Sequence, residues 1–166
     1  TKAARAEKLV KMGYLKRLAA RLKMKAVYEW IDTFLESNEG KLVIYCCHKK
    51  ILDKLVARYK KCAVHVDGGV TGKNRKLAVQ MFQTNSKIRL FIGNIRAAGT
   101  GLTLTAASHL AFVELDWVPS NMTQSEDRIH RIGQKNVANI YYLVAKGTIE
   151  EYLCEIIQEK QEVVST

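Results

Sequence analysis

The chain has 166 residues, of which 48% are hydrophobic, and its 27 basic and 16 acidic residues give a net charge of +11. This length and hydrophobic content predict one globular domain with a core of its own and exclude a disordered tail. No apolar run approaches the roughly 18 residues of a membrane span, so we expect no membrane partner, and the basic excess favours polyanions such as nucleic acid.

The four cysteines predict free thiols and no metal site, because they form no C-x-x-C pair and have no histidine at zinc-ligand spacing. Free thiols are typical of a reducing, intracellular compartment. The chain begins without Met, and its basic first 25 residues lack the apolar block of a signal peptide. We therefore expect a fragment of an intracellular protein, nuclear in a eukaryote and cytoplasmic or nucleoid-associated in a prokaryote or virus.

In chain order, apolar residues first recur at helical spacing over residues 15–22 and 27–35, and Asn38 and Gly40 end this helical region. From Lys41 onward, short apolar runs alternate with amphipathic stretches, which predicts strands alternating with helices. The predicted strands are Leu42–Cys46, Ala63–Val66, Ile88–Ile92, Leu110–Leu115 and Ile140–Val144. The predicted helices cover residues 51–59, residues 71–82 with Thr71 as N-cap, Ser120–Arg131 after Pro119, and a last helix opened by the capping-box pair Thr148 and Glu151.

Continuous apolar strands that alternate with helices predict an α/β domain of three layers, with a mainly parallel central sheet of at least five strands and helices on both faces. Residues 23–166 are expected to form this domain, and residues 1–22 a basic helical extension that precedes it. Ligands of such folds bind at the loops beyond the carboxyl ends of the strands. These loops are expected at residues 47–50, 67–73, 93–103 and 116–120.

The glycine-rich stretch at residues 68–74 resembles a phosphate-binding loop but lacks its spacing. Gly68 and Gly72 enclose three residues where a P-loop has four, and Asn74 stands in place of its Ser or Thr. Glu114 and Asp116 could mimic a magnesium-binding acidic pair, but without a P-loop they have no nucleotide to serve. We therefore expect no efficient ATP binding or hydrolysis by this chain alone, while the glycine turn remains a reasonable contact for a backbone phosphate.

A second candidate site lies in the predicted helix at residues 120–131. Gln124, Arg128 and Arg131 stand at i, i+4 and i+7, which would place them on one helical face. Two arginines on one face can clamp a phosphate with their fork-shaped donors. Surface salt bridges to Glu126 or Asp127 explain the spacing about equally well, so both readings stay open.

The turn Gly99-Thr100-Gly101 follows a buried strand and would let the backbone approach a ligand closely, although a plain loop turn explains it at least as well.

Taken together, the ordered motifs resemble the C-terminal RecA-like lobe of superfamily-two helicases, specifically the Swi/Snf-type double-stranded DNA translocases. Residues 124–134 resemble motif VI (Q-x-x-x-R-x-x-R-x-G-Q), residues 97–104 motif V, and residues 42–50 motif IV. The runs at 114–117 and 143–148 are similar to those of the fork-remodelling, strand-annealing branch.

The resemblance implies that Arg128 and Arg131 are arginine fingers and that Gln124 helps to order the nucleotide site. ATP and Mg²⁺ would be held mainly by an N-terminal RecA-like lobe that this chain does not contain. The implied nucleotide-binding residues are Gly99, Gly101 and Asp127. The implied nucleic-acid contacts are His48, Lys49, Lys50, Gly68, Arg75, Asn94, Thr100 and Trp117, although a core position explains Trp117 about equally well.

The implied function is the second motor lobe of an ATP-dependent translocase on double-stranded or forked DNA, inactive as an ATPase without the first lobe and monomeric when isolated. A standalone nucleic-acid-binding module and a lobe of an RNA helicase are the alternatives. Motif VI argues against the first, because a pure binder does not need two phosphate-clamping arginines, and its pattern favours the DNA branch over the second. Two departures from the family pattern, Ala98 before Gly99 and Thr103 in place of Asn, put only the fine DNA geometry in doubt.

Overall fold

A five-stranded sheet organises the computed structural model, which describes residues 2–97 and 101–165, with side chains described as far as residue 160. Neighbouring strands are parallel throughout, in the order β2-β3-β1-β4-β5. The strands are β1 (Lys41–Cys46), β2 (Ala63–Val66), β3 (Leu90–Asn94), β4 (Ala107–Phe112) and β5 (Asn139–Tyr142). The register pairs Ile44 of β1 with Ile92 of β3 and Ala111 of β4, so buried apolar side chains lie side by side across the sheet.

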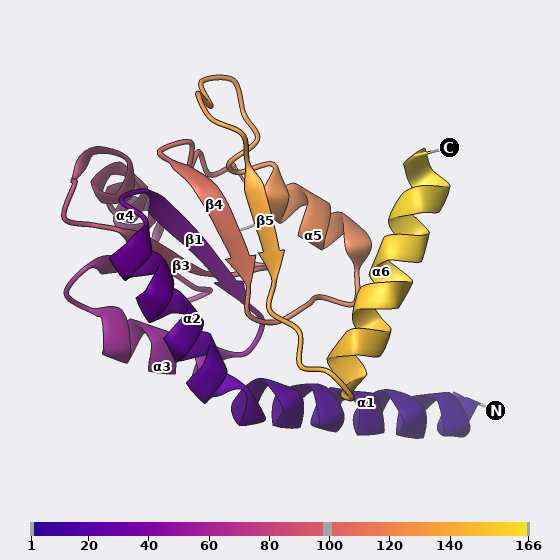
Figure 1. Cartoon of the computed structure of the whole chain (residues 1–166). Helices are drawn as coiled ribbons and strands as arrows, with labels where there is room; N and C mark the ends of the chain where they lie inside the picture. The colour runs from indigo at the N-terminus through magenta and orange to yellow at the C-terminus, as the bar shows by residue number, and fades with distance from the viewer. Residues whose placement is uncertain (1, 98–100, 166) are drawn as a thin grey trace.

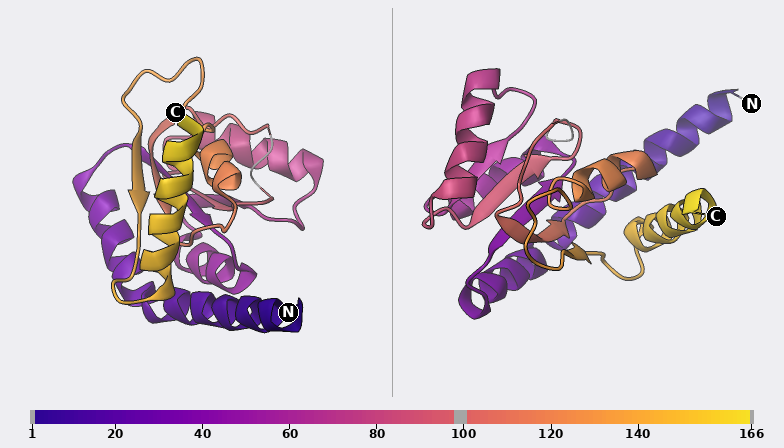
Figure 2. Two further views of the ribbon diagram at one scale, coloured as in Figure 1. Left: turned by 90° about the vertical axis from the view of Figure 1, so that its right-hand side faces the viewer. Right: turned by 90° about the horizontal axis from the view of Figure 1, so that it is seen from above.

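Helices cover both faces of this sheet (Figures 1 and 2). They are α1 (Lys2–Leu22), α2 (Met24–Ser37), α3 (Lys49–Tyr59), α4 (Gly72–Thr84), α5 (Pro119–Glu126) and α6 (Ile149–Ser165). Buried residues of α2 and α3 pack with one set of strand side chains, which includes Ile44 and Ile92. Those of α4, α5 and α6 pack with the opposite set, which includes Tyr45 and Phe91. The predicted three-layer α/β fold with a parallel sheet is therefore confirmed.

Three predicted strands are displaced from their observed positions. The third is β5, which ends at Tyr142 and not at Val144. In the other two, buried residues continue beyond the hydrogen-bonded strand. β4 ends at Phe112 instead of Leu115, yet Val113 and Leu115 stay buried in the loop that follows it. β3 begins at Leu90, two residues later than predicted, although Ile88 is already buried. Apolar periodicity reports burial, and it cannot separate a strand from a buried loop.

The predicted helix over Ser120–Arg131 is wrong in its second half, since α5 ends at Glu126. A continuing helix would hydrogen-bond the Arg128 amide to the Gln124 carbonyl. Here the Arg128 side chain takes that carbonyl through Nε at 2.9 Å, and its amide donates to the carbonyl of Ser125 at 3.2 Å. The chain continues in turns, so Gln124, Arg128 and Arg131 do not share a helical face.

The predicted N-terminal extension coincides with α1, which lies at the end of the molecule toward which the arrowheads of β4 and β5 point (Figure 1). Its first turns are exposed, whereas Lys16, Ala19 and Ala20 are buried against the domain. Just after α1, Lys23 Nζ donates to the Leu143 carbonyl at 2.6 Å and to Glu150 at 2.7 Å. Lys23 thus fastens the start of α2 to the first turn of α6 through the buried ion pair, and to the loop after β5 through the Leu143 carbonyl. A domain boundary at residue 22 stays a prediction.

The opening of α6 differs from the predicted capping box. Thr148 Oγ1 accepts the Glu150 amide at 3.3 Å, and the Glu151 carboxylate accepts the amide of Gly147 at 2.9 Å instead of that of Thr148. The cap therefore uses the expected residues with the pairing shifted by one position.

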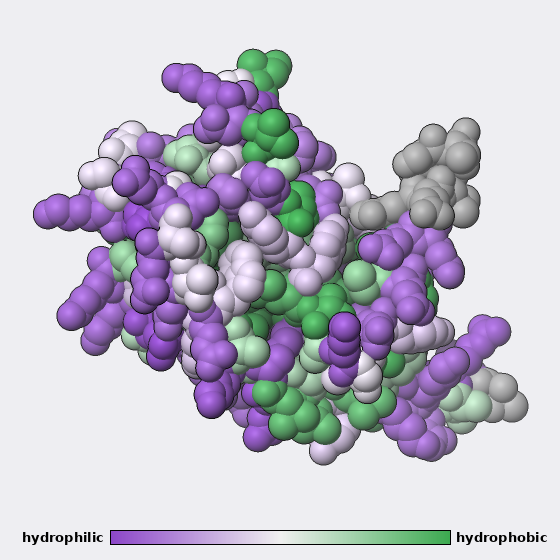
Figure 3. All heavy atoms as spheres, in the orientation of Figure 1, coloured by the Kyte–Doolittle hydropathy of each residue, from purple (hydrophilic) through white to green (hydrophobic). Residues whose placement is uncertain are grey.

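Among residues 2–97 and 101–165, no helix is long and apolar enough to cross a membrane. Hydrophilic residues predominate around the outline of the molecule in Figure 3.

The contribution of the core beneath α4 can be measured at Phe82, which is fully buried with its ring centroid 5.6 Å from that of Phe91. Phe82→Ala should lower the free energy of unfolding by about 3–5 kcal/mol, because it removes buried area and leaves a cavity. Leu77→Ala on the same helix removes a side chain that is 52% exposed and should cost less than about 1 kcal/mol. Urea unfolding followed by circular dichroism measures both, and equal losses would contradict the packing described.

Candidate functional site

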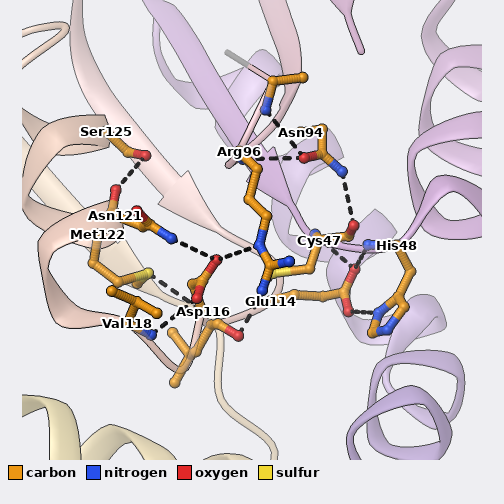
Figure 4. A network of polar contacts seen from close by, with 12 residues as sticks. Cys47, His48, Asn94, Arg96, Glu114, Asp116, Val118, Asn121, Met122 and Ser125 are labelled. Carbon is orange, nitrogen blue, oxygen red and sulfur yellow. Dashed lines mark hydrogen bonds and ion pairs between the residues drawn. The ribbon is translucent and has the colours of Figure 1, made fainter. Parts of the chain in front are cut away.

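A buried carboxylate joins the loops that follow β1 and β4 at the carboxyl edge of the sheet (Figure 4). Glu114 is 1% exposed, and its Oε1 accepts the backbone amides of Cys47 at 3.0 Å and His48 at 2.9 Å. Its other oxygen, Oε2, accepts the hydrogen bond of His48 Nδ1, so the Nε2 atom of that imidazole is left for another partner. The position of His48 at the start of α3 is therefore set from within the protein.

These hydrogen bonds determine the charge state of Glu114. Burial alone would raise the pKa of this carboxyl, but the hydrogen bonds from the His48 side chain and from the amides of His48 and Cys47 outweigh burial and lower the pKa. The carboxylate is consequently ionised at neutral pH, where it accepts three hydrogen bonds.

Asp116 organises the next part of the same edge and is also 1% exposed. Its carboxylate accepts the Val118 amide at 2.9 Å, Asn121 Nδ2 at 3.2 Å and Arg96 Nε at 3.3 Å (Figure 4). It therefore connects the loop after β3 to the entrance of α5. These bonds hold the loop between β4 and α5 in place.

Asn94 connects the loop after β3 to the loop after β1. Its Nδ2 donates to the Cys47 carbonyl at 2.7 Å, and its Oδ1 accepts the Arg96 amide at 3.0 Å. Both ends of the amide are thus engaged within the protein. The predicted contact of Asn94 with DNA stays a prediction, and the structure gives this residue a role in holding two loops together.

The acidic pair at residues 114 and 116 does not fit a magnesium site. The oxygens of Glu114 and Asp116 are occupied by hydrogen bonds from their own loops, and both side chains are almost fully buried. Across residues 2–97 and 101–165 there is no group of three or more His, Cys, Asp or Glu side chains that could hold a metal ion. Glu114 and Asp116 therefore serve to hold their own loops in place.

The two motif VI arginines occupy different environments. Arg128 is 7% exposed, and its Nη1 has no hydrogen-bond partner among the residues that the structure describes. Burial, and next the nearby charge of Arg131, lower the pKa of Arg128. Arg131 lies in the turns after α5, is partly exposed, and donates from Nη1 to Thr103 Oγ1 at 3.2 Å. Gln124 and Asp127, also predicted site residues, are exposed.

The contact of Arg131 with Thr103 brings motif VI beside the segment that follows β3. A pocket of about 450 Å³ opens there between α4 and residues 101–103, and Arg75 is one of its lining residues. The amide of Leu104 donates to the Arg128 carbonyl at 3.0 Å, which fastens the two segments together. Gly101 adopts a positive φ of 72°, as a tight turn requires. The predicted residues Gly99 and Thr100 lie outside the described part of the chain.

The glycine-rich loop after β2, which resembles a phosphate-binding loop, is an exposed turn. Gly68 is exposed, a Cβ atom there would meet nothing within 4 Å, and Asp67 Oδ1 accepts the Gly69 amide at 2.8 Å. Thr71 stands at the N-cap position of α4, but its side chain makes no capping hydrogen bond. No internal contact therefore demands a glycine at position 68, and its predicted contact with DNA stays a prediction.

Trp117 occupies a partly buried position, and its predicted contact with DNA stays a prediction. The side chain is half-buried and packs against the core beneath α4 and α6. The Nζ atom of Lys16 in α1 lies 5.9 Å from the ring centroid and donates to Cys47 Sγ at 3.5 Å. Trp117 is thus at least a core residue, and it borders the positively charged extension.

Sequence reasoning gave no role to Gln134, the last residue of motif VI. Its Nε2 donates to the carbonyls of Ala107 at 2.7 Å and Ile129 at 3.0 Å, which holds the turns after α5 against the start of β4. The structural roles of Glu114 and Asp116 were missed as well. A signal for them was present, since each carboxylate interrupts or ends an apolar run and must be hydrogen-bonded when buried.

Glu114→Gln should lower the free energy of unfolding by about 2–4 kcal/mol at pH 7, because a neutral amide cannot accept all three hydrogen bonds. Since folding lowers the pKa of Glu114, its contribution is present above the unfolded-state pKa of about 4.3 and is lost as the pH falls through the folded-state value. The difference from wild type, measured by urea unfolding, should therefore shrink below about pH 4. Exposed Glu36→Gln is the control, and a pH-independent difference for Glu114→Gln would contradict this account.

Comparison with known proteins agrees with this arrangement. Residues 22–133 match the family described as the helicase conserved C-terminal domain. The chain is 40% identical over 148 residues to the SWI/SNF-related matrix-associated actin-dependent regulator of chromatin subfamily A-like protein 1 of Xenopus laevis. It is 36% identical over 161 residues to the DNA annealing helicase and endonuclease ZRANB3 of Homo sapiens. The alignments cover 87% and 93% of this chain but only 15% of each relative's length.

A solved structure has the same fold. The crystal structure of the C-terminal part of the Fun30 ATPase domain superposes with a TM-score of 0.74 at 25% identity, over 81% of this chain and 44% of that one. The family match covers more than half of the chain and includes the loops after β1, β3 and β4. This chain therefore belongs to the family of helicase conserved C-terminal domains, and its relatives include SWI/SNF-related proteins and annealing helicases.

Proposed function

We propose that this chain is the second motor lobe of an ATP-dependent translocase on double-stranded or forked DNA, and that it completes an ATP site built mainly by another lobe. The observation that carries the proposal is the pair of arginines after α5. Arg128 and Arg131 have no ion-pair partner within the described residues, and Arg128 keeps a buried donor unsatisfied. A buried unsatisfied donor costs free energy and calls for an explanation, which an external phosphate supplies.

In this function the two arginines act on ATP that the first lobe holds together with Mg²⁺. Their guanidinium groups stabilise the charge that develops on the γ-phosphate when the two lobes close. The hydrogen bond between Leu104 and Arg128 and the contact between Arg131 and Thr103 connect these arginines to the segment after β3. A shift of the arginines on nucleotide binding would thereby reach residues 101–104, which the resemblance assigns to motif V.

Nucleic-acid binding is proposed at the loops beyond the carboxyl ends of β1, β2 and β3. Lys49 and Lys50 are exposed at the start of α3, behind which Glu114 holds His48 in place. Such contacts bind the phosphate backbone, so they favour no sequence and weaken with salt. The relatives' names, which describe a chromatin regulator and a DNA annealing helicase, support DNA as the substrate and a nuclear location in a eukaryote. The proposal adds that this DNA is double-stranded or forked and that the lobe, monomeric when isolated, pairs with the first lobe of its own protein.

The finger assignment is tested in a longer protein that contains both lobes. Arg131→Ala should lower DNA-stimulated ATP turnover by about 10³–10⁵-fold, the range for loss of an arginine finger, while ATP affinity changes little. Arg5→Ala, which removes an exposed arginine from α1, is the matched control and should leave turnover within twofold of wild type. Steady-state ATPase assays at saturating duplex DNA measure both. Turnover of the Arg131→Ala protein within a few-fold of wild type would contradict the assignment of Arg131 as an arginine finger.

The dependence on a first lobe is tested with the 166-residue chain alone. Purified chain should hydrolyse ATP no faster than a protein-free blank, with or without duplex DNA, because the chain contains no P-loop. Phosphate release measured with a coupled assay gives the rate. A rate that rises with chain concentration and falls in the Arg131→Ala variant would show that the chain builds a complete site and would refute the proposal.

A further inference from the structure

A positively charged pocket lies between α1 and the start of α3, where two arginines of α1 that no motif includes meet the end of the stretch that resembles motif IV. It has a volume of about 240 Å³ and is lined by Arg17, Arg21, His48, Lys49, Lys50 and Ile51. Arg17 and Arg21 are four residues apart on α1, so both side chains leave the same face of the helix. Two segments more than twenty residues apart in sequence thus bring their cationic groups to one place.

The positive charge of this pocket is mostly uncompensated. The side chains of Arg17, Arg21 and Lys50 make no hydrogen bond or ion pair with any residue that the structure describes. Lys49 alone among the lining cations is paired, with Asp53 at 3.3 Å and Asp67 at 3.5 Å. The unpaired cations repel one another where they converge, and an anion that enters between them relieves this repulsion.

The pocket is held in place by contacts behind it. Lys16, the residue before Arg17, is only 5% exposed, and its Nζ contacts the sulfur of Cys47 and the ring of Trp117. Burial raises the pKa of Cys47 to about 12, so Lys16 contacts a neutral thiol. Ala19 and Ala20 are buried at 3% and 0% exposure, which seats this turn of α1 closely on the domain. The opposite wall is held by Glu114, which bonds the amides of Cys47 and His48.

We propose that this pocket binds a phosphodiester group of the DNA backbone, which makes α1 part of the nucleic-acid interface. The guanidinium groups of Arg17 and Arg21 offer paired donors that match phosphate oxygens. The first turn of the eleven-residue helix α3, whose N-cap His48 provides no side-chain cap, adds amide donors at the same place. The pocket is continuous with Lys49 and Lys50, so a strand that contacts these residues passes it. The inference rests on the proposed function and extends its DNA path to the extension.

The test compares two double variants of the 166-residue chain that remove the same charge from α1. Arg17→Ala with Arg21→Ala empties the pocket of its arginines, whereas Arg5→Ala with Lys8→Ala removes exposed cations from the first turns. Binding of a fluorescently labelled duplex is measured by anisotropy between 50 and 200 mM salt. The pocket variant should bind roughly 3- to 10-fold more weakly at about 100 mM salt, and the slope of log K against log salt should fall by about one per lost phosphate contact. The control should change affinity less than about twofold.

Two results would overturn the inference: equal weakening in both double variants, which would indicate a diffuse charge effect, or an unchanged affinity and salt slope in the pocket variant. Circular dichroism melting confirms that each variant is folded, as expected for Arg→Ala on an exposed helical surface. In the two-lobed protein, the pocket variant should raise the DNA concentration for half-maximal ATPase and leave turnover at saturating DNA unchanged. Arg131→Ala should lower turnover at saturating DNA and leave the DNA concentration for half-maximal ATPase unchanged. Failure of the finger assignment and failure of the pocket are therefore distinguishable.

Discussion

The arrangement of the carboxyl edge depends on one buried interaction, the ionised carboxylate of Glu114 between the loops after β1 and β4. A carboxylate at 1% exposure is tolerable only when its oxygens are satisfied, and two amides and an imidazole satisfy them here. Because those donors belong to Cys47 and His48, the same bonds determine where α3 begins. The cations that follow, Lys49 and Lys50, consequently project from a rigid base.

Acidic and basic residues have different fates in this lobe. The buried carboxylates Glu114, Asp116 and Glu150 all accept hydrogen bonds from the protein's own loops or from Lys23. Several basic side chains, among them Arg17 and Arg21, have no acidic partner in the part of the chain described. Internal bonding thus occupies these three carboxylates, whereas the unpaired basic side chains remain able to bind an anion.

Much of the fold followed from the apolar pattern, because a parallel sheet covered on both faces produces short continuous apolar strands. Ala63–Val66 was predicted to the residue. The apolar pattern predicted strand ends wrongly where residues are buried without strand hydrogen bonds. Leu115, for example, is buried after the end of β4. The motifs indicated a candidate site that stays a prediction, and the helical spacing assumed for Gln124, Arg128 and Arg131 was wrong. The Arg128 side chain binds the Gln124 carbonyl, which a continuing helix would pair with the Arg128 amide. Helical periodicity in the sequence cannot predict this side-chain hydrogen bond.

The same hydrogen bond bears on how Arg128 could work. Its Nε bond to the Gln124 carbonyl holds the guanidinium inside the lobe, while Nη1 lacks a partner and the hydroxyl of the buried Tyr45 lacks one as well, within the described residues. Internal packing has therefore not optimised this arrangement for stability, since burying unpaired polar atoms weakens a fold. In the proposed function, a phosphate held by another lobe would offer strong acceptors to the guanidinium group of Arg128. The free energy that the isolated lobe forgoes would then be recovered when the lobes close, which makes closure on nucleotide more favourable than closure on an empty site.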